Sequence, residues 1–134
     1  MENTKLLRMV TILYGFLVDG IVGIFLVSLY LNGDLTLVEG PHRFEAMLSD
    51  IIALLMMFWG ICFVLLGIWR KQEIGVLCLV LAIVNMVFIA WGHMSDGNPM
   101  SFIVWGIAFH FFLFVLPTAL VTKALTAETR LLAS

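Results

Sequence analysis

The chain has 134 residues, of which 63% are hydrophobic and only 12% are charged, and its formal net charge is −2. A soluble domain carries roughly 25% charged residues, so this chain could not cover a water-facing surface. The negative net charge and the lack of a basic patch with interleaved aromatic residues exclude a nucleic-acid-binding protein. The composition predicts a single membrane-embedded domain with lipid as its main solvent.

Four long apolar segments follow one another along the chain, at 6–31, 47–69, 74–92 and 102–122. Each is long enough to cross a hydrocarbon layer about 30 Å thick at roughly 1.5 Å per residue. Only a short polar turn at 70–73 separates the second segment from the third, so these two form an antiparallel hairpin. We therefore expect an all-α integral membrane protein with four transmembrane helices in an up-down-up-down bundle.

The basic residues predict the orientation of this bundle. Arg43 is the one basic residue expected at the outer end, and the other six of the seven gather at the opposite end: Lys5, Arg8, Arg70, Lys71, Lys123 and Arg130. Cytoplasmic segments of membrane proteins carry an excess of Lys and Arg. We therefore expect both termini and the 70–73 turn on the cytoplasmic side.

Asp19 is an acidic residue in the middle of the first predicted span. An ionisable group at this depth costs several kcal/mol, which makes it a candidate functional residue. Gly15 and Gly23 lie four residues before and after it, on a stripe of small residues that lets helix backbones approach closely. We expect a protonated carboxyl group in a packed interface, donating a hydrogen bond to a backbone carbonyl or to Asn85. The alternative is a proton- or cation-coupled site.

The third span carries small and polar residues at alternating steps of three and four, typical of one seam of a left-handed helix pair. This seam consists of Gly75, Cys78, Ala82, Asn85, Ile89 and Gly92. We expect Asn85 to form a hydrogen bond across a helix interface, with a role in a binding site as the alternative.

The fourth span contains His110, one turn after Gly106, and then Pro117. Proline has no backbone N–H, so the carbonyl of Leu113 loses its usual helical partner. Asn85 and His110 are expected at similar depth, with Asp19 about one turn deeper, so the three side chains could form an intramembrane polar cluster. His110 is interpreted either as a hydrogen-bonded packing residue or as a proton or ligand site.

Several candidate metal ligands lie toward the expected outer face: His42, Glu45, Asp50, His93 and Asp96. Histidine and carboxylate groups are suitable ligands, but no compact ligand motif joins them. A haem between His93 and His110 of one chain fails because the two lie at depths about 13 Å apart. No metal or other cofactor is firmly implied, and without a catalytic motif we expect no enzymatic activity.

The layout of the chain resembles the small four-helix bacterial membrane proteins called DoxX-like. The resemblance rests on a glycine-bearing first helix (Gly15, Gly20 and Gly23), a long outer loop and a tight basic turn at Arg70 and Lys71. It implies a bacterial inner membrane and an accessory subunit of a quinone-linked oxidoreductase. The small multidrug-resistance transporters are also similar, but this chain has Asp19 where they have a glutamate, and its first outer loop is longer.

Three functional hypotheses follow. The first is an accessory or assembly subunit of a larger membrane complex, with a protein partner or a second copy of the chain. The second is a proton-coupled small-molecule transporter with Asp19 as its coupling carboxylate. The third is a redox subunit associated with a quinone or a haem.

Overall fold

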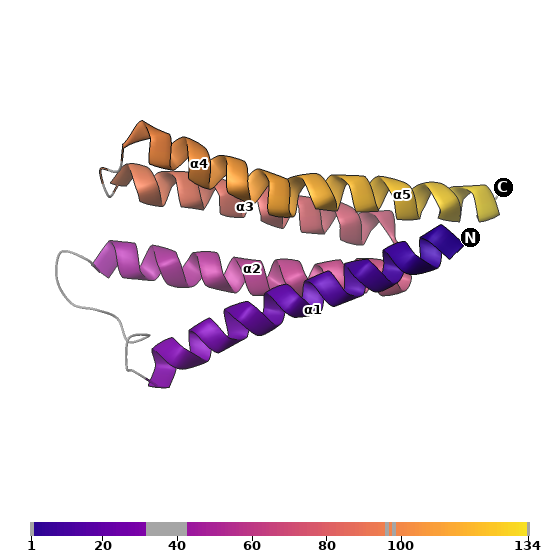
Figure 1. Ribbon diagram of the computed structural model, residues 1–134, viewed down its shortest axis with the longest axis horizontal. Coiled ribbons are helices and arrows are strands. Elements are labelled where there is room, and N and C mark those ends of the chain that lie inside the picture. The colour runs from indigo at the N-terminus through magenta and orange to yellow at the C-terminus, as the bar shows by residue number, and fades with distance from the viewer. Residues whose placement is uncertain (1, 32–42, 96, 98, 134) are drawn as a thin grey trace.

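The computed structural model describes residues 2–31, 43–95, 97 and 99–133, and all of its regular structure is helical. The first three long helices are α1 (Glu2–Leu31), α2 (Arg43–Trp69) and α3 (Gln72–Ser95). The fourth consists of α4 (Met100–His110), a π-helical turn η1 (Phe111–Val115) and α5 (Leu116–Ala133). Neighbouring helices run antiparallel, as Figure 1 shows.

Four segments are long and apolar enough to cross a membrane: Thr4–Ser28, Asp50–Trp69, Gln72–Met94 and Met100–Ala127. Each overlaps one predicted span, and the fourth extends beyond the predicted 102–122. The prediction of an all-α membrane protein with four helices in adjacent antiparallel pairs is thus confirmed. Both ends of the chain and the turn between α2 and α3 lie at one end of the bundle, which we call the basic end (Figure 1).

The turn at the basic end is held by two arginines. Arg70 adopts a left-handed conformation with φ 55°, and its N–H donates to the Leu66 carbonyl at 2.9 Å, which ends α2. Arg8 reaches across from α1, donating from Nε to the Gly67 carbonyl at 2.9 Å and from Nη2 to the Ile68 carbonyl at 3.0 Å. A positive charge on the last carbonyls of a helix is favourable because these groups lack helical partners and carry the negative end of the dipole.

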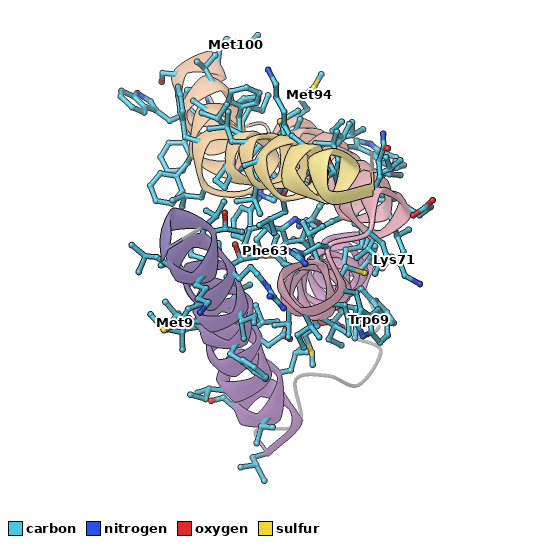
Figure 2. All side chains as sticks on the ribbon, turned by 90° about the vertical axis from the view of Figure 1, so that its right-hand side faces the viewer. Met9, Phe63, Trp69, Lys71, Met94 and Met100 are labelled. Atoms are coloured by element: carbon cyan, nitrogen blue, oxygen red, sulfur yellow. The ribbon has the colours of Figure 1, made fainter. Side chains whose placement is uncertain are left out.

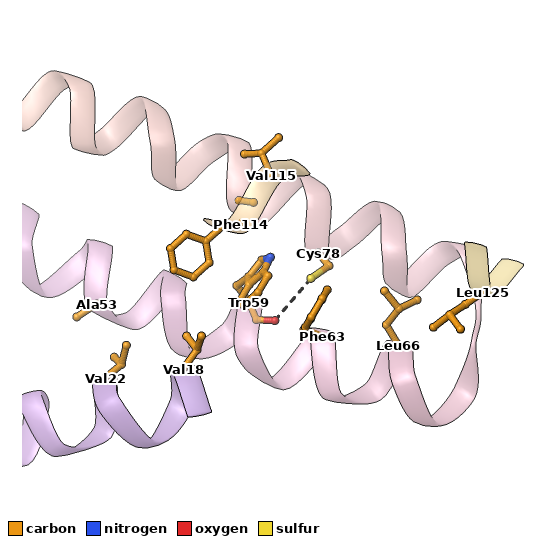
Figure 3. Packing of buried hydrophobic residues seen from close by; sticks show 11 residues of the cluster. Val18, Val22, Ala53, Trp59, Phe63, Leu66, Cys78, Phe114, Val115 and Leu125 are labelled. Atoms are coloured by element: carbon orange, nitrogen blue, oxygen red, sulfur yellow. Dashed lines mark hydrogen bonds between the residues drawn. The ribbon is translucent and has the colours of Figure 1, made fainter. Parts of the chain in front are cut away.

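An aromatic cluster fills the middle of the bundle, where α1, α2 and the fourth helix meet (Figure 3). Trp59 stacks on Phe63 with ring centroids 4.6 Å apart, and Phe114 meets its ring edge-on at 4.9 Å. Tyr14 contacts Trp59 and Phe63 edge-on from α1. Such edge-on and stacked pairs add to the contact energy of burial.

The π-helical turn lies directly before Pro117 and widens the fourth helix. Here the Leu116 N–H donates to the Phe111 carbonyl, five residues earlier, and Pro117 leaves the Leu113 carbonyl without its helical donor. The Tyr14 hydroxyl on α1 donates to this carbonyl at 2.6 Å. The Leu113 carbonyl, which the sequence predicted to lose its helical partner, therefore accepts a hydrogen bond that joins α1 to the fourth helix.

Candidate functional site in the membrane core

Asp19 lies on the side of α1 that packs against α2. Its Oδ1 rests so close to the α-carbon of Gly60 that a methyl group added there would collide with it. One turn earlier, a Cβ added at Gly15 would lie 2.6 Å from Cγ2 of Val64 and 2.8 Å from the Gly60 carbonyl oxygen. Gly15 and Gly60 thus mark the closest approach of the two helices, and Asp19 borders it.

Asp19 Oδ1 is buried without a hydrogen-bond partner among the described residues. The bond to Asn85 or to a backbone carbonyl that we expected from the sequence is therefore not made by this oxygen. A buried polar atom without a partner is costly and calls for a functional explanation or a bound group.

The small residues of α2 that pack against α1 were not recognised from the sequence. A Cβ added at Gly67 would lie 2.7 Å from Cγ1 of Ile12, so this glycine also lies in the α1–α2 contact. Ala53, which is buried, Gly60 and Gly67 are spaced by seven residues and form one heptad seam of small side chains. A search of this span for small residues at heptad spacing would have found it.

The other predicted glycine of α1 requires a correction. Beyond Asp19, α1 leans away from the other helices (Figures 1 and 2), and a Cβ added at Gly20 or Gly23 would meet nothing within 4 Å. Val22 is buried in the core with Ala53, and Leu26 packs against the same core, so the outer half of α1 keeps one covered side, and Gly23 lies away from it. On the uncovered side, Ile24 is 74% exposed, Val27 is 57% exposed and Leu31 is 77% exposed.

A shallow groove runs along the side of the outer half of α1 that faces away from the core, which we call the open face. It begins at Asp19 and is lined by Gly20, Gly23, Ile24, Val27, Ser28 and Leu31. The single acidic residue of the predicted cluster thus borders both the α1–α2 contact and the open face.

His110, another member of the predicted cluster, lies at the interface of α3 with the fourth helix. His110 Nε2 is 3.0 Å from the Ala82 carbonyl oxygen, and because a carbonyl only accepts, Nε2 carries the hydrogen. The imidazole ring also stacks on Phe114 with centroids 4.6 Å apart. Metal ligation through Nε2 would break the bond to Ala82.

Asn85 lies one turn along α3 from Ala82 and is 2% exposed, and its Oδ1 has no hydrogen-bond partner among the described residues. Asn85 is thus buried one turn from Ala82, whose carbonyl accepts from His110. Asp19 lies between α1 and α2, and within the described part of the chain no hydrogen bond joins Asp19 to Asn85 or His110.

Two further polar contacts tie Trp59 of α2 to its neighbours beside this site, and a third lies within the fourth helix. Trp59 Nε1 donates to Thr118 Oγ1 at 3.0 Å, and Thr118 donates to the Phe114 carbonyl at 2.5 Å. Cys78 donates a weak sulfur hydrogen bond to the Trp59 carbonyl at 3.6 Å (Figure 3). Thr118 was not recognised from the sequence, because a threonine one residue after a proline has no distinguishing spacing.

The remaining predicted packing residues lie along α3 and α4. Gly75 faces Thr122 of α5, Ala82 is 1% exposed, and Gly92 is half-buried. At Gly106, an added Cβ would be 3.1 Å from His93 Nε2, so the imidazole occupies the space that this glycine leaves.

Of the five candidate metal ligands, only Asp50 and His93 have described side chains. His42, Asp96 and the side chain of Glu45 lie outside the described residues. Among the side chains that the structure does describe, no three His, Cys, Asp or Glu residues come together as metal ligands would.

Comparison of the chain with protein-family models, with curated proteins and with solved structures found no match. The fold and its apolar helices define the class: a small polytopic membrane protein with four candidate spans. The resemblance to the DoxX-like proteins stays a prediction.

Proposed function

We propose that this chain is a non-enzymatic accessory or assembly subunit that packs the open face of α1 against a helix of another membrane protein subunit. The observation that carries the proposal is the pair of glycines, Gly20 and Gly23, that meet no described part of the chain, whereas Gly15 of the same helix packs closely against α2.

In a bilayer, hydrophobic burial does not drive helices together, because lipid tails are as apolar as the side chains. Helix association there depends on close packing, which small residues allow, and on polar contacts. Gly20 and Gly23 supply the first requirement, and Asp19, which lines the same groove, supplies a group for the second. A lipid-facing helix has no need of either.

We further infer that the basic end faces the cytoplasm, with both termini inside, and that the membrane is a bacterial inner membrane. The clustering of basic residues at the end that holds both termini and the α2–α3 turn supports this orientation. The membrane itself follows only from the DoxX-like resemblance.

Purification in a mild detergent, followed by measurement of the protein mass, tests the proposal. One chain has a mass of 15.0 kDa, and we expect the native species to be larger. Gly23→Leu should release the partner. Ile21→Leu, at the same depth but on the opposite, exposed side of α1, should retain it. A wild-type protein that is stable as a single chain without a co-purifying subunit would contradict the proposal.

A proton-coupled small-molecule transporter is the second candidate, and the buried, unpartnered Oδ1 of Asp19 within a span favours it. This function predicts a ligand-binding signal that depends on pH in the wild type and loses that dependence in Asp19→Asn. A pH-dependent signal that survives the substitution unchanged would remove its main support.

A further inference from the structure

A second groove, unrelated to α1, lies between α3 and α5 in the half of the bundle nearest the basic end. Its volume is about 400 Å³. Gln72, Lys123 and Thr126 line the part nearest the basic end, and Val76, Leu79 and Ala119 line the part toward the middle of the span. The lining therefore changes from polar and cationic to apolar along the direction of the membrane normal.

The floor of this groove is formed where α3 and α5 touch. Gly75 lies so close to Thr122 that an added Cβ would collide with the threonine side chain, so the helices meet here without a bulky residue between them. Thr122 Oγ1 is buried and has no hydrogen-bond partner among the described residues. The groove thus has a closed floor and flanks that face the lipid.

We propose that this groove binds one anionic phospholipid, with the phosphate beside Lys123 and an acyl chain along Val76, Leu79 and Ala119. A lipid at this end of the bundle presents its charged headgroup at the level of the basic residues and its chain toward the bilayer centre. This is the same order as the polarity of the groove. Basic pockets between transmembrane helices recognise anionic headgroups in this way.

The charges around the groove favour an anion. Lys123 lines it and is exposed, and Lys71 is exposed nearby at the same end. Glu73 also lies at this end, in the first turn of α3, but it is not part of the lining. The inference uses no residue of α1, so it stands or falls separately from the proposed subunit contact.

The full chain, purified in detergent, would be titrated with phosphatidylglycerol and with phosphatidylcholine of identical acyl chains, and bound lipid counted by native mass spectrometry. We expect the anionic lipid to be preferred, and Lys123→Gln to reduce that preference about five-fold, the equivalent of roughly 1 kcal/mol per basic residue near an anionic lipid surface. Lys71→Gln removes an equal charge outside the groove and should preserve the preference.

A second pair of variants tests the shape of the groove without changing charge. Ala119→Trp fills the apolar part and should lower the retention of phosphatidylglycerol at least as much as Lys123→Gln. Leu120→Trp, at the next, exposed position outside the lining, should leave it unchanged.

Three results would overturn the proposal. One is equal retention of the two lipids by the wild type, and another is an equal loss in Lys123→Gln and Lys71→Gln, which would indicate a diffuse positive surface. The third is displacement of the lipid by millimolar inorganic phosphate, which would indicate a small-anion site.

Discussion

Both halves of α1 carry glycines, but only the glycine in the half nearest the basic end packs against α2. In the half nearest the basic end, Gly15 lies against Val64 and the Gly60 carbonyl, Arg8 binds the end of α2, and Tyr14 binds the fourth helix. In the other half, a Cβ added at Gly20 or Gly23 would meet no described atom within 4 Å. A stripe of small residues thus indicates that a second helix can approach closely. The angle at which α1 crosses α2 determines which of these small residues lie in a contact within the chain.

The largest expected effect distinguishes the two halves directly. Gly15→Leu should lower the free energy of unfolding by about 2–3 kcal/mol, because its side chain would have to displace Val64 and the α2 backbone. Gly23→Leu should change the stability of the isolated chain by less than about 0.5 kcal/mol. Unfolding in mixed micelles with a rising fraction of sodium dodecyl sulfate measures both. Equal losses in the two variants would mean that the open face of α1 is covered in the isolated chain as well.

The next effect concerns the link between α1 and the fourth helix. Tyr14→Phe should cost about 1 kcal/mol, because it removes the donor to the Leu113 carbonyl that Pro117 leaves unsatisfied. In a Pro117→Ala background the new backbone N–H can satisfy that carbonyl, so Tyr14→Phe should cost markedly less there. The same unfolding assay, run as a double-mutant cycle, provides the coupling energy. A cost that is independent of residue 117 would contradict the link.

A smaller effect is expected at the end of α2. Arg8→Gln should destabilise the chain by up to about 1 kcal/mol, because the guanidinium group contacts the last carbonyls of that helix. Lys5 is an exposed basic residue one turn earlier on α1, so Lys5→Gln is the matched control and should hardly change the free energy of unfolding. If the two variants lose the same amount of stability, Arg8 acts only through the net charge of this end.

The smallest effect is expected at Asp19. Asp19→Asn retains the shape of the side chain beside Gly60, so stability should change by less than about 0.5 kcal/mol. Asp19→Leu should cost more, since branched carbon atoms would press against the same glycine. A large loss of stability in Asp19→Asn alone would show that the carboxyl group holds a specific bond in the folded chain.

The sequence was sufficient for the architecture because span length, apolarity and the polar turn at 70–73 depend on local composition. The backbone defect at Pro117 was also predictable, since it follows from the missing N–H of one residue. The seam of Ala53, Gly60 and Gly67 could have been found from its heptad spacing. The acceptor of His110 and the bond of Tyr14 were not predictable, because each depends on the rotation and crossing of two helices. The same limitation explains Gly23. It lies on the same stripe as Gly15, but it does not take part in the contact that Gly15 makes with α2.

Photo-crosslinking from α1 in native membranes tests the central claim, that the open face is reserved for another subunit. A photoreactive residue placed at Gly23 should form adducts with a different polypeptide or a second copy of the chain. The same probe at Ile21, on the opposite side of the helix, should react only with lipid. If the probe at position 23 reacts only with lipid, or with α2 to α5 of its own chain, the outer half of α1 is not an assembly surface.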